Sequence, residues 1–193
     1  MPHKAKVVFM KPERMRGRYS ASAQFFHWLS ALLVGLAWLL GQLREDFERG
    51  EPRRIVDFVH VSSGQLIVAL LALRIIWRFI APPSPEASPA GPWAVRAAKF
   101  AHILLYVLLI AAPAAGVVTL FADGKPMPLF GLGEIASPWV KDKALEHSAK
   151  EIHEWLANGL IVLAALHASA ALAHHFRLRD GVLKRMLPRW IAE

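Results

Sequence analysis

The stretch EIHEWLANGLIVLAALHASAALAHHF, residues 151–176, combines a long apolar run with four histidines, His153, His167, His174 and His175. A helix needs about 20 mainly apolar residues to cross the hydrocarbon core of a bilayer, and this stretch provides them. Ionisable side chains inside a bilayer are costly and usually serve a function. The stretch therefore predicts a transmembrane helix whose histidines do more than pack.

Two of these histidines have a spacing that is typical of stacked cofactor sites. His153 and His167 are fourteen residues apart, which on an α-helix gives about 21 Å of rise and about 40° of rotation. They share one face at different depths. If each meets a histidine from another helix, the bundle would hold two haem groups, and bundle interiors are where such sites are built. His60 is at the right depth to meet His153, and bis-histidine ligation favours electron transfer over oxygen binding.

Three further apolar segments are long enough to cross a bilayer. The expected spans are residues 25–43, 58–80, 100–121 and 153–176. The chain is 55% hydrophobic, and its mean hydropathy of +0.34 is unusually high for a soluble domain of 193 residues. Pro113 lies inside the third span, where we expect a kink rather than an end. The sequence predicts an all-α, integral membrane four-helix bundle that forms a single domain, residues 1–193.

The charges outside the spans predict the orientation. Residues 1–22 form a basic arm, residues 81–92 a Pro-rich surface linker, residues 122–150 a long loop and residues 177–193 a tail. Lys and Arg dominate the arm, the end of the second span with its linker, and the tail, whereas the other two loops are near charge balance. By the positive-inside rule both termini should be cytoplasmic. The 122–150 loop should then cap the external end, since loops of that length are usually functional or partly structured.

Composition also excludes several kinds of site. The net charge is +8, but the basic residues flank the apolar runs and form no stripe interleaved with aromatics, so we expect membrane lipid and no nucleic acid as a partner. The chain has no cysteine, which excludes disulfides, iron–sulfur clusters and covalent attachment of c-type haem. Metal chemistry must therefore rest on histidine or carboxylate.

The partner of His27 cannot be settled by depth. His27 lies at the cytoplasmic end of the first span, so depth alone matches it to His174 or His175, whereas His167 lies a few turns deeper. Helix tilt could absorb this difference. His102, at the cytoplasmic end of the third span, is a further candidate. A structural role at the membrane interface stays open for these shallow histidines.

The sequence resembles the prokaryotic cytochrome b-561 family. Four segments carry the resemblance, in matching order and spacing: FFHWLSALLVG (25–35), VHVSSG (59–64), FAHILLYVLLIAAPAAG (100–116) and the stretch 151–176. It extends from about Tyr19 to Pro188 and includes KPMPLFGLG at 125–133 and LPRW at 187–190. Only the basic arm, to about Arg18, is longer than the family pattern.

The resemblance implies a di-haem b protein in the bacterial inner membrane. In such a protein the positions that match His27 and His167 bind the iron of the inner haem, and those that match His60 and His153 bind the iron of the outer haem. The other histidines of the spans then become candidates for proton supply or quinone contact: His102, His174 and His175.

The pattern is most similar to the superoxide oxidase branch of the family, which implies that superoxide gives electrons at the periplasmic side and ubiquinone accepts them. Basic residues of the external loops could focus the superoxide anion, although a solvated surface is the alternative interpretation for each: Arg53, Arg54, Lys125, Lys141, Lys143 and Lys150. Arg74 and Arg78 could pair with haem propionates. They could equally form the positive flank of the second span.

Two other functions remain compatible with the sequence. The protein could be a cytochrome b subunit that relays electrons between a partner dehydrogenase, acting as electron-donor protein, and the quinone pool. It could also be a histidine-rich transporter, but the histidines divide between two membrane levels and the span interiors lack acidic residues, so a cation path has few of its usual groups.

Overall fold

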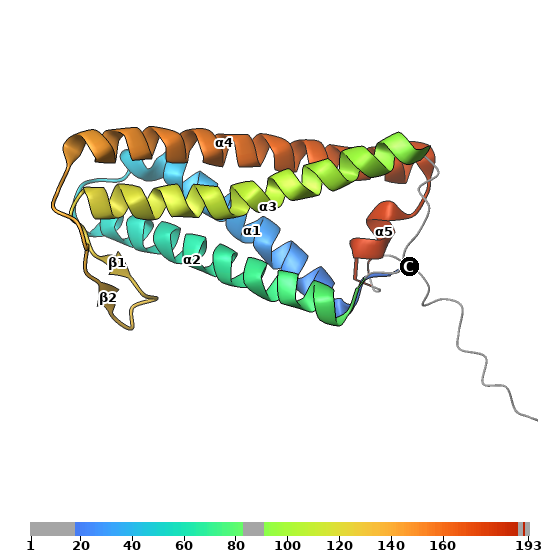
Figure 1. The fold of residues 1–193 in the computed structure, drawn as a ribbon, viewed down its shortest axis with the longest axis horizontal. Helices are drawn as coiled ribbons and strands as arrows, with labels where there is room; N and C mark the ends of the chain where they lie inside the picture. Colours follow the sequence, from blue (N-terminus) through green and yellow to red (C-terminus); the bar gives the residue numbers. More distant parts are fainter. Residues whose placement is uncertain (1–17, 83–90, 189–190, 192–193) are drawn as a thin grey trace, which may run out of the picture.

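The computed structural model describes residues 18–82, 91–188 and 191, and its long helices run lengthwise through the molecule (Figure 1). Two short strands lie at one end, here called the strand end, and helix α5 lies at the other, here called the α5 end. The elements in chain order are α1 (Ala21–Leu43), η2 (Arg44–Asp46), α2 (Glu51–Ile80), α3 (Gly91–Ala122), β1 (Met127–Pro128), β2 (Glu134–Ile135), α4 (Lys143–Ala173), the π-helix η3 (His174–Leu178) and α5 (Val182–Met186).

The long helices are suited to lipid. Within the described residues, four of them are long and apolar enough to cross a membrane, which confirms the expected all-α membrane bundle. Large apolar side chains face outward, among them Phe79, Trp93 and Trp155, which are 83%, 76% and 80% exposed. Exposure of many large apolar side chains is unfavourable in water and is typical of a membrane-facing surface.

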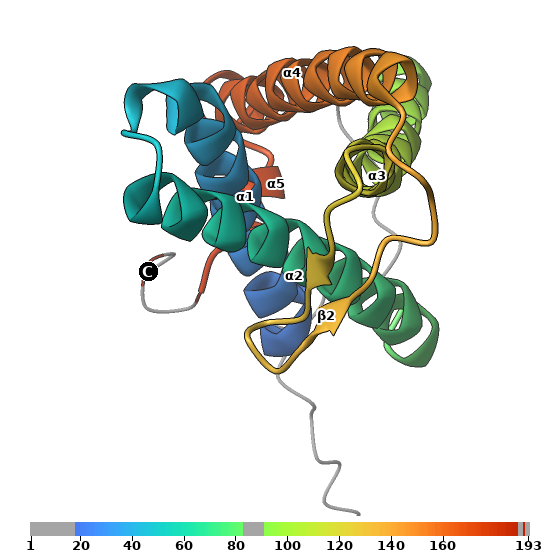
Figure 2. The same cartoon turned by 90° about the vertical axis from the view of Figure 1, so that its left-hand side faces the viewer.

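The bundle consists of two helical hairpins. Helix α1 packs against α2, and α3 packs against α4, while the two hairpins make fewer contacts with each other; Figure 2 shows both pairs from the strand end. Their shared core is centred on Ile67, Leu71, Leu109 and Leu160. Along α4, Leu160 lies midway between His153 and His167, so this apolar core separates the two histidines.

Helix α4 begins ten residues earlier than the expected span at 153. Asp142 caps it, because its carboxylate accepts hydrogen bonds from the backbone N–H groups of Ala144 and Leu145, both at 3.0 Å. Hydropathy locates the part of a helix that faces lipid and misses such polar first turns. The expected loop of residues 122–150 is therefore corrected to one that ends at Asp142.

Helices α2 and α3 also begin earlier than expected, at Glu51 and Gly91 rather than at residues 58 and 100. Pro52 lies in the first turn of α2, where its missing N–H costs no helical hydrogen bond. The expected linker of residues 81–92 is shortened by Gly91 and Pro92, and its residues 83–90 lie outside the described part of the chain. Helix α3 continues through Pro113 as expected.

The loop after α3 folds against the strand end. Asp123 accepts from the ammonium groups of Lys125, Lys141 and Lys143 at 2.8, 2.8 and 2.9 Å, and these groups hold the pKa of Asp123 well below its usual range. Strands β1 and β2 pair antiparallel. The amide of Gln65 on α2 donates to the carbonyl of Pro128 at 2.6 Å. The loop thus packs on this end of the bundle, as its length suggested.

The tail returns to the start of α1 at the α5 end. The indole of Trp28 donates to the Met186 carbonyl at 2.8 Å, and the amide of Gln24 donates to the Arg185 carbonyl at 3.0 Å. The expected tail of residues 177–193 therefore begins inside η3 and includes a short helix. Most of the basic arm, residues 1–17, lies outside the described part of the chain.

Candidate functional site

The histidines of the long helices form two groups at different levels. The outer pair, His60 of α2 and His153 of α4, lies toward the strand end, and the inner pair, His27 of α1 and His167 of α4, lies toward the α5 end. Each pair joins one helix of the α1–α2 hairpin to α4 of the other hairpin. The structure thus brings together both pairs that the resemblance implies, and their role as ligands stays a prediction.

The outer pair is held symmetrically by backbone carbonyl groups. The ring centroids of His60 and His153 are 5.9 Å apart, with an interplanar angle of 81°. Nδ1 of His60 is 2.8 Å from the carbonyl oxygen of Ala37 on α1, and Nδ1 of His153 is 2.8 Å from that of Ala112 on α3. A carbonyl can only accept, so each Nδ1 carries a proton and each Nε2 is left with a free lone pair. That tautomer is the one that can bind a metal ion through Nε2.

A glycine lies close to each ring of the outer pair. Gly41 follows Ala37 by four residues, and Gly116 follows Ala112 by four residues. A Cβ atom on Gly116 would lie 3.2 Å from the ring of His153, and one on Gly41 would lie 3.4 Å from the ring of His60. Each ring therefore sits against a helix backbone that a side chain would obstruct.

The inner group contains three rings and a guanidinium. The ring centroids of His27 and His167 are 6.4 Å apart, and those of His102 and His167 are 5.1 Å apart. Nη2 of Arg74 on α2 is 3.1 Å from Nδ1 of His27, and the same guanidinium lies 5.8 Å from the ring centroid of Tyr106. His102 is exposed on the surface of α3. The inner group is thus richer in charge and more open than the outer pair.

The contact of Arg74 gives His27 a tautomer that differs from the outer pair. A guanidinium can only donate, so Nδ1 of His27 accepts this hydrogen bond and the ring proton of the neutral imidazole sits on Nε2. Ligation through Nε2 would require the proton to move to Nδ1. Arg74 would then need another acceptor, such as a carboxylate.

Both pairs fit the spacing that a shared metal ion requires. Imidazole nitrogens bind first-row metal ions at about 2 Å, so two imidazoles on opposite sides of one ion have ring centroids about 6 Å apart. The outer and inner centroid distances of 5.9 and 6.4 Å agree with this value. Farther along α2, two and five residues after His60, the buried Ser62 Oγ and Gln65 Oε1 have no hydrogen-bond partner among the described residues.

The remaining residues that the sequence analysis singled out, His174, His175 and Arg78, lie apart from both histidine pairs. Nδ1 of His174 lies 2.5 Å from the carboxylate of Asp180, and the ring of His175 lies against Phe176. Arg78 is exposed at the end of α2. Within the described residues, no three His, Asp or Glu side chains converge to hold one metal ion.

Some residues of the candidate site could not be identified from the sequence alone. The carbonyls of Ala37 and Ala112 carry no side-chain signal, and Gly41 and Gly116 were not distinguished from other small residues of the spans. The only available signal was an Ala followed four residues later by Gly in both α1 and α3. On its own this spacing also suits ordinary helix packing in membranes.

Basic residues surround a hollow of about 240 Å³ at the strand end, next to the outer pair. Most of them are partly neutralised: Arg44 pairs with Asp57 at 2.5 Å, Arg53 pairs with Glu45 at 3.1 Å and Arg54 pairs with Glu51 at 3.1 Å. Asp57 lies three residues before His60 on α2. The lining residues are Arg44, Arg49, Gly50, Arg53, Arg54, Asp57 and Lys125.

The sequence pattern described as prokaryotic cytochrome b561 matches residues 18–189. The chain belongs to the prokaryotic cytochrome b561 family. This confirms the resemblance, whose expected extent, Tyr19 to Pro188, nearly coincides with the match. As a member of this family, the protein is a multi-pass bacterial membrane protein that binds haem b and transfers electrons.

Relatives of known name cover nearly the whole chain. Cytochrome b561 homolog 2 of Escherichia coli (strain K12) is 35% identical over 172 residues, which are 88% of this chain and 91% of the relative. A probable superoxide oxidase CybB of Yersinia pestis is 33% identical over 177 residues, which are 91% of this chain and 98% of the relative. Cytochrome b561 homolog 1 of Escherichia coli (strain K12) is 30% identical over 174 residues, which are 89% of this chain and 98% of the relative.

Proposed function

We propose that this cytochrome b561 binds two haem b groups and uses them to pass electrons from superoxide to ubiquinone across the bacterial inner membrane. One observation carries the proposal: two histidine pairs at two levels of the bundle, each with the centroid spacing of a bis-histidine site. Haem b so held would supply reversible one-electron chemistry with no open iron position.

The outer pair is proposed to bind the outer haem through Nε2 of His60 and Nε2 of His153. The two Nδ1–H groups donate to Ala37 and Ala112, which fixes the tautomer and the orientation of both rings. Hydrogen bonds of this kind make a histidine a more basic ligand. The outer site is therefore organised by the protein itself.

The inner pair, His27 and His167, is proposed to bind the inner haem. Arg74 reaches His27 and is half-buried beside the pair, so its guanidinium is placed to pair with a haem propionate when His27 binds iron through Nε2. The exposed Arg78, one turn later, is a second candidate partner.

Superoxide is proposed to approach at the strand end. The relationship to a probable superoxide oxidase supports this donor. So does the hollow next to the outer pair, because basic residues still outnumber acidic ones in its lining despite the ion pairs there, and an excess of positive charge attracts a small anion. Two superoxide anions would each lose one electron to give dioxygen, and the two electrons with two protons would reduce ubiquinone to ubiquinol.

Ubiquinone is proposed to react toward the α5 end. His102 supports this location, because it is exposed on the apolar surface of α3 and lies 5.1 Å from His167. Quinone reduction consumes protons, which a histidine can deliver. His174 and His175 remain further candidates for proton supply. The positive-inside rule supports cytoplasmic termini, and in that orientation the α5 end would face the cytoplasm and the strand end the periplasm.

Stopped-flow absorption spectroscopy tests the proposal. We expect mixing of the purified, oxidised protein with superoxide to give the reduced haem band rapidly, and added ubiquinone to reoxidise it. Superoxide dismutase in the mixing buffer should abolish the reduction. Haem that stays oxidised under superoxide but is reduced by a copurifying dehydrogenase would contradict the oxidase and favour the relay subunit.

A further inference from the structure

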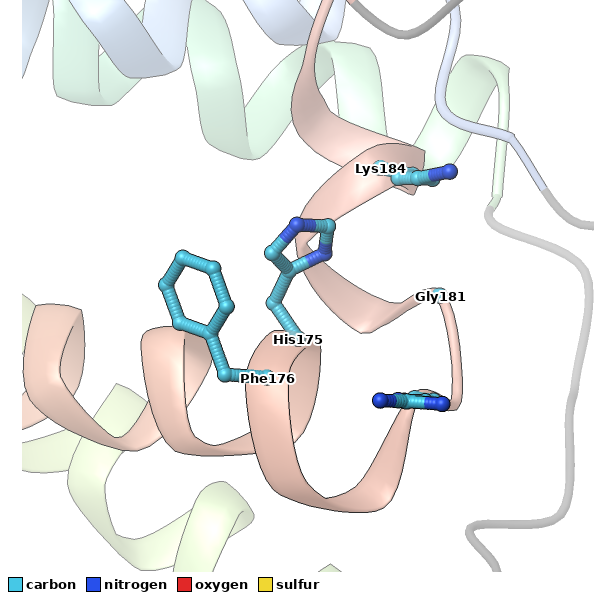
Figure 3. Close-up of a pocket in the computed structure, with 5 residues that line it drawn as sticks. His175, Phe176, Gly181 and Lys184 are labelled. Carbon is cyan, nitrogen blue, oxygen red and sulfur yellow. The ribbon is translucent and has the colours of Figure 1, made fainter.

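A hollow at the α5 end has the properties of an anion site, which goes beyond the proposed electron transfer. It lies where η3 turns into α5, has a volume of about 370 Å³, and is lined by His175, Phe176, Arg179, Gly181 and Lys184. Figure 3 shows the ring of His175 reaching from η3 toward α5, which carries Lys184. Three basic side chains from two helical segments and their connecting turn therefore border one hollow.

A buried carboxylate shapes the turn beside this hollow. The carboxylate of Asp180, only 2% exposed, lies 2.5 Å from Nδ1 of His174 and accepts a hydrogen bond from the backbone N–H of Val182 at 3.1 Å. Arg179 has a φ of 51° and Gly181 has a φ of 76°. A left-handed residue other than Gly is uncommon and must be held by its surroundings. Asp180 supplies that restraint, and its charge is directed to His174 rather than to the bases of the hollow.

The lining bases lack acidic partners within the described residues. Arg179 and Lys184 are exposed and form no ion pair in the described part of the chain. At the strand end, by contrast, Asp123 contacts three lysines, and the arginines of the other hollow contact Glu45, Glu51 and Asp57. Positive charge is therefore left uncompensated at the α5 hollow.

Apolar side chains adjoin the hollow on the membrane side. Phe176, which lines the hollow, is 69% exposed, and Leu178 is 49% exposed; both belong to the candidate membrane span Lys143–Leu178. A ligand with a phosphate group and an acyl chain could place its phosphate against the basic side chains and its acyl chain against Phe176.

We propose that this hollow binds a phosphate group, and that an anionic phospholipid supplies it. Arg179 can contact two phosphate oxygens at once, and Lys184 adds a point charge. Basic pockets at helix ends near the membrane surface are suited to anionic head groups. The site is independent of haem and of the electron donor.

Native mass spectrometry of the full-length protein tests the site, with phosphatidylglycerol, phosphatidylcholine and inorganic phosphate as separate probes. The Arg179→Asn/Lys184→Gln variant keeps a residue that tolerates a left-handed backbone at position 179. We expect it to weaken binding of the first phosphatidylglycerol by roughly tenfold or more. The Arg179→Lys/Lys184→Arg variant should retain binding.

A variant with the same loss of charge serves as the control. Arg96→Gln/Arg177→Gln removes two bases near the same end that do not line the hollow, and its affinity for phosphatidylglycerol should equal that of the wild type. Equal weakening in both double variants, or equal binding of phosphatidylcholine and phosphatidylglycerol, would overturn the site. If the Arg179→Asn/Lys184→Gln variant loses binding of inorganic phosphate but binds phosphatidylglycerol like the wild type, the hollow is a phosphate site and the lipid is not its ligand. Circular dichroism verifies folding, and Lys184→Gln alone carries the test if the double variant unfolds.

Discussion

The outer and inner histidine groups differ in what holds their rings. In the outer pair each Nδ1 donates to a backbone carbonyl, and a glycine lies against each ring. In the inner group His27 accepts from Arg74, and a third ring, His102, lies beside His167. Backbone partners fix a ring in one tautomer, whereas side-chain partners can rearrange. The outer group is therefore built to hold one ligand geometry, and the inner group is built to respond to charge and protons.

Removal of an outer ligand should have the largest effect. We expect His153→Ala to lose the outer haem and keep the inner one, because the remaining imidazole of His60 cannot complete a bis-histidine site. The pyridine haemochrome assay would give half of the wild-type haem per chain. His147→Ala is the matched control, since His147 lies on the same helix with a side chain that is 74% exposed. Unchanged haem content in His153→Ala would contradict the assignment.

Obstruction of an outer ring should have the next largest effect. A Cβ on Gly116 already comes within 3.2 Å of His153, so Gly116→Leu should displace the ring and lower outer haem content by roughly half or more. Gly35→Leu and Gly159→Leu have no atom within 4 Å of the added Cβ and should keep full haem content. If all three variants bind haem equally, the close approach has no role in the outer site.

Loss of the Arg74 guanidinium should change the midpoint potential of the inner haem only. Arg74→Gln removes a positive charge beside His27, which should lower the midpoint potential of the inner haem by on the order of tens of millivolts. Arg74→Lys should restore most of that potential. Redox titration followed by optical spectroscopy measures both haems together. A shift in the midpoint potential of the outer haem alone would contradict the placement of Arg74 beside the inner haem.

The ion cluster at the strand end should contribute modestly to stability. The three lysines lower the pKa of Asp123, so its stabilisation is complete above the unfolded-state pKa of about 4 and is lost as the pH falls through the folded-state pKa. Asp123→Asn should cost about 1 kcal/mol at neutral pH, because the lysines are exposed to solvent, and less below pH 4. Thermal unfolding measured against pH checks this, with Glu134→Gln in β2 as the control. An effect that grows as the pH falls below 4 would contradict the sign.

Substitution of the third inner ring should leave the haem content unchanged. His102→Phe keeps His27 and His167, so we expect two haems per chain and slower reoxidation by ubiquinone. The haemochrome assay and stopped-flow reoxidation measure these separately. Loss of one haem would instead assign His102, whose ring is nearer to His167 than that of His27, as the inner ligand.

The sequence predicted the membrane bundle and the two separate levels of His153 and His167 on one helix, because apolar length and helical rise depend only on spacing along one helix. It predicted helix starts poorly, since the first polar turns of α2 and α4 carry no hydropathy signal. The pairing of His27 could not be derived from depth, because it depends on helix tilt. The carbonyl partners Ala37 and Ala112 were also out of reach, since backbone contacts between helices depend on how each helix is rotated in the bundle.

The two histidine pairs predict that each chain holds two bis-histidine haems. The most direct test is the haem-to-protein ratio of the wild-type protein, from the pyridine haemochrome assay and quantitative amino-acid analysis, together with low-temperature electron paramagnetic resonance of the oxidised form. We predict two haem b per chain, both low-spin. A single haem per chain, or a high-spin centre with an open position, would be incompatible with two bis-histidine sites.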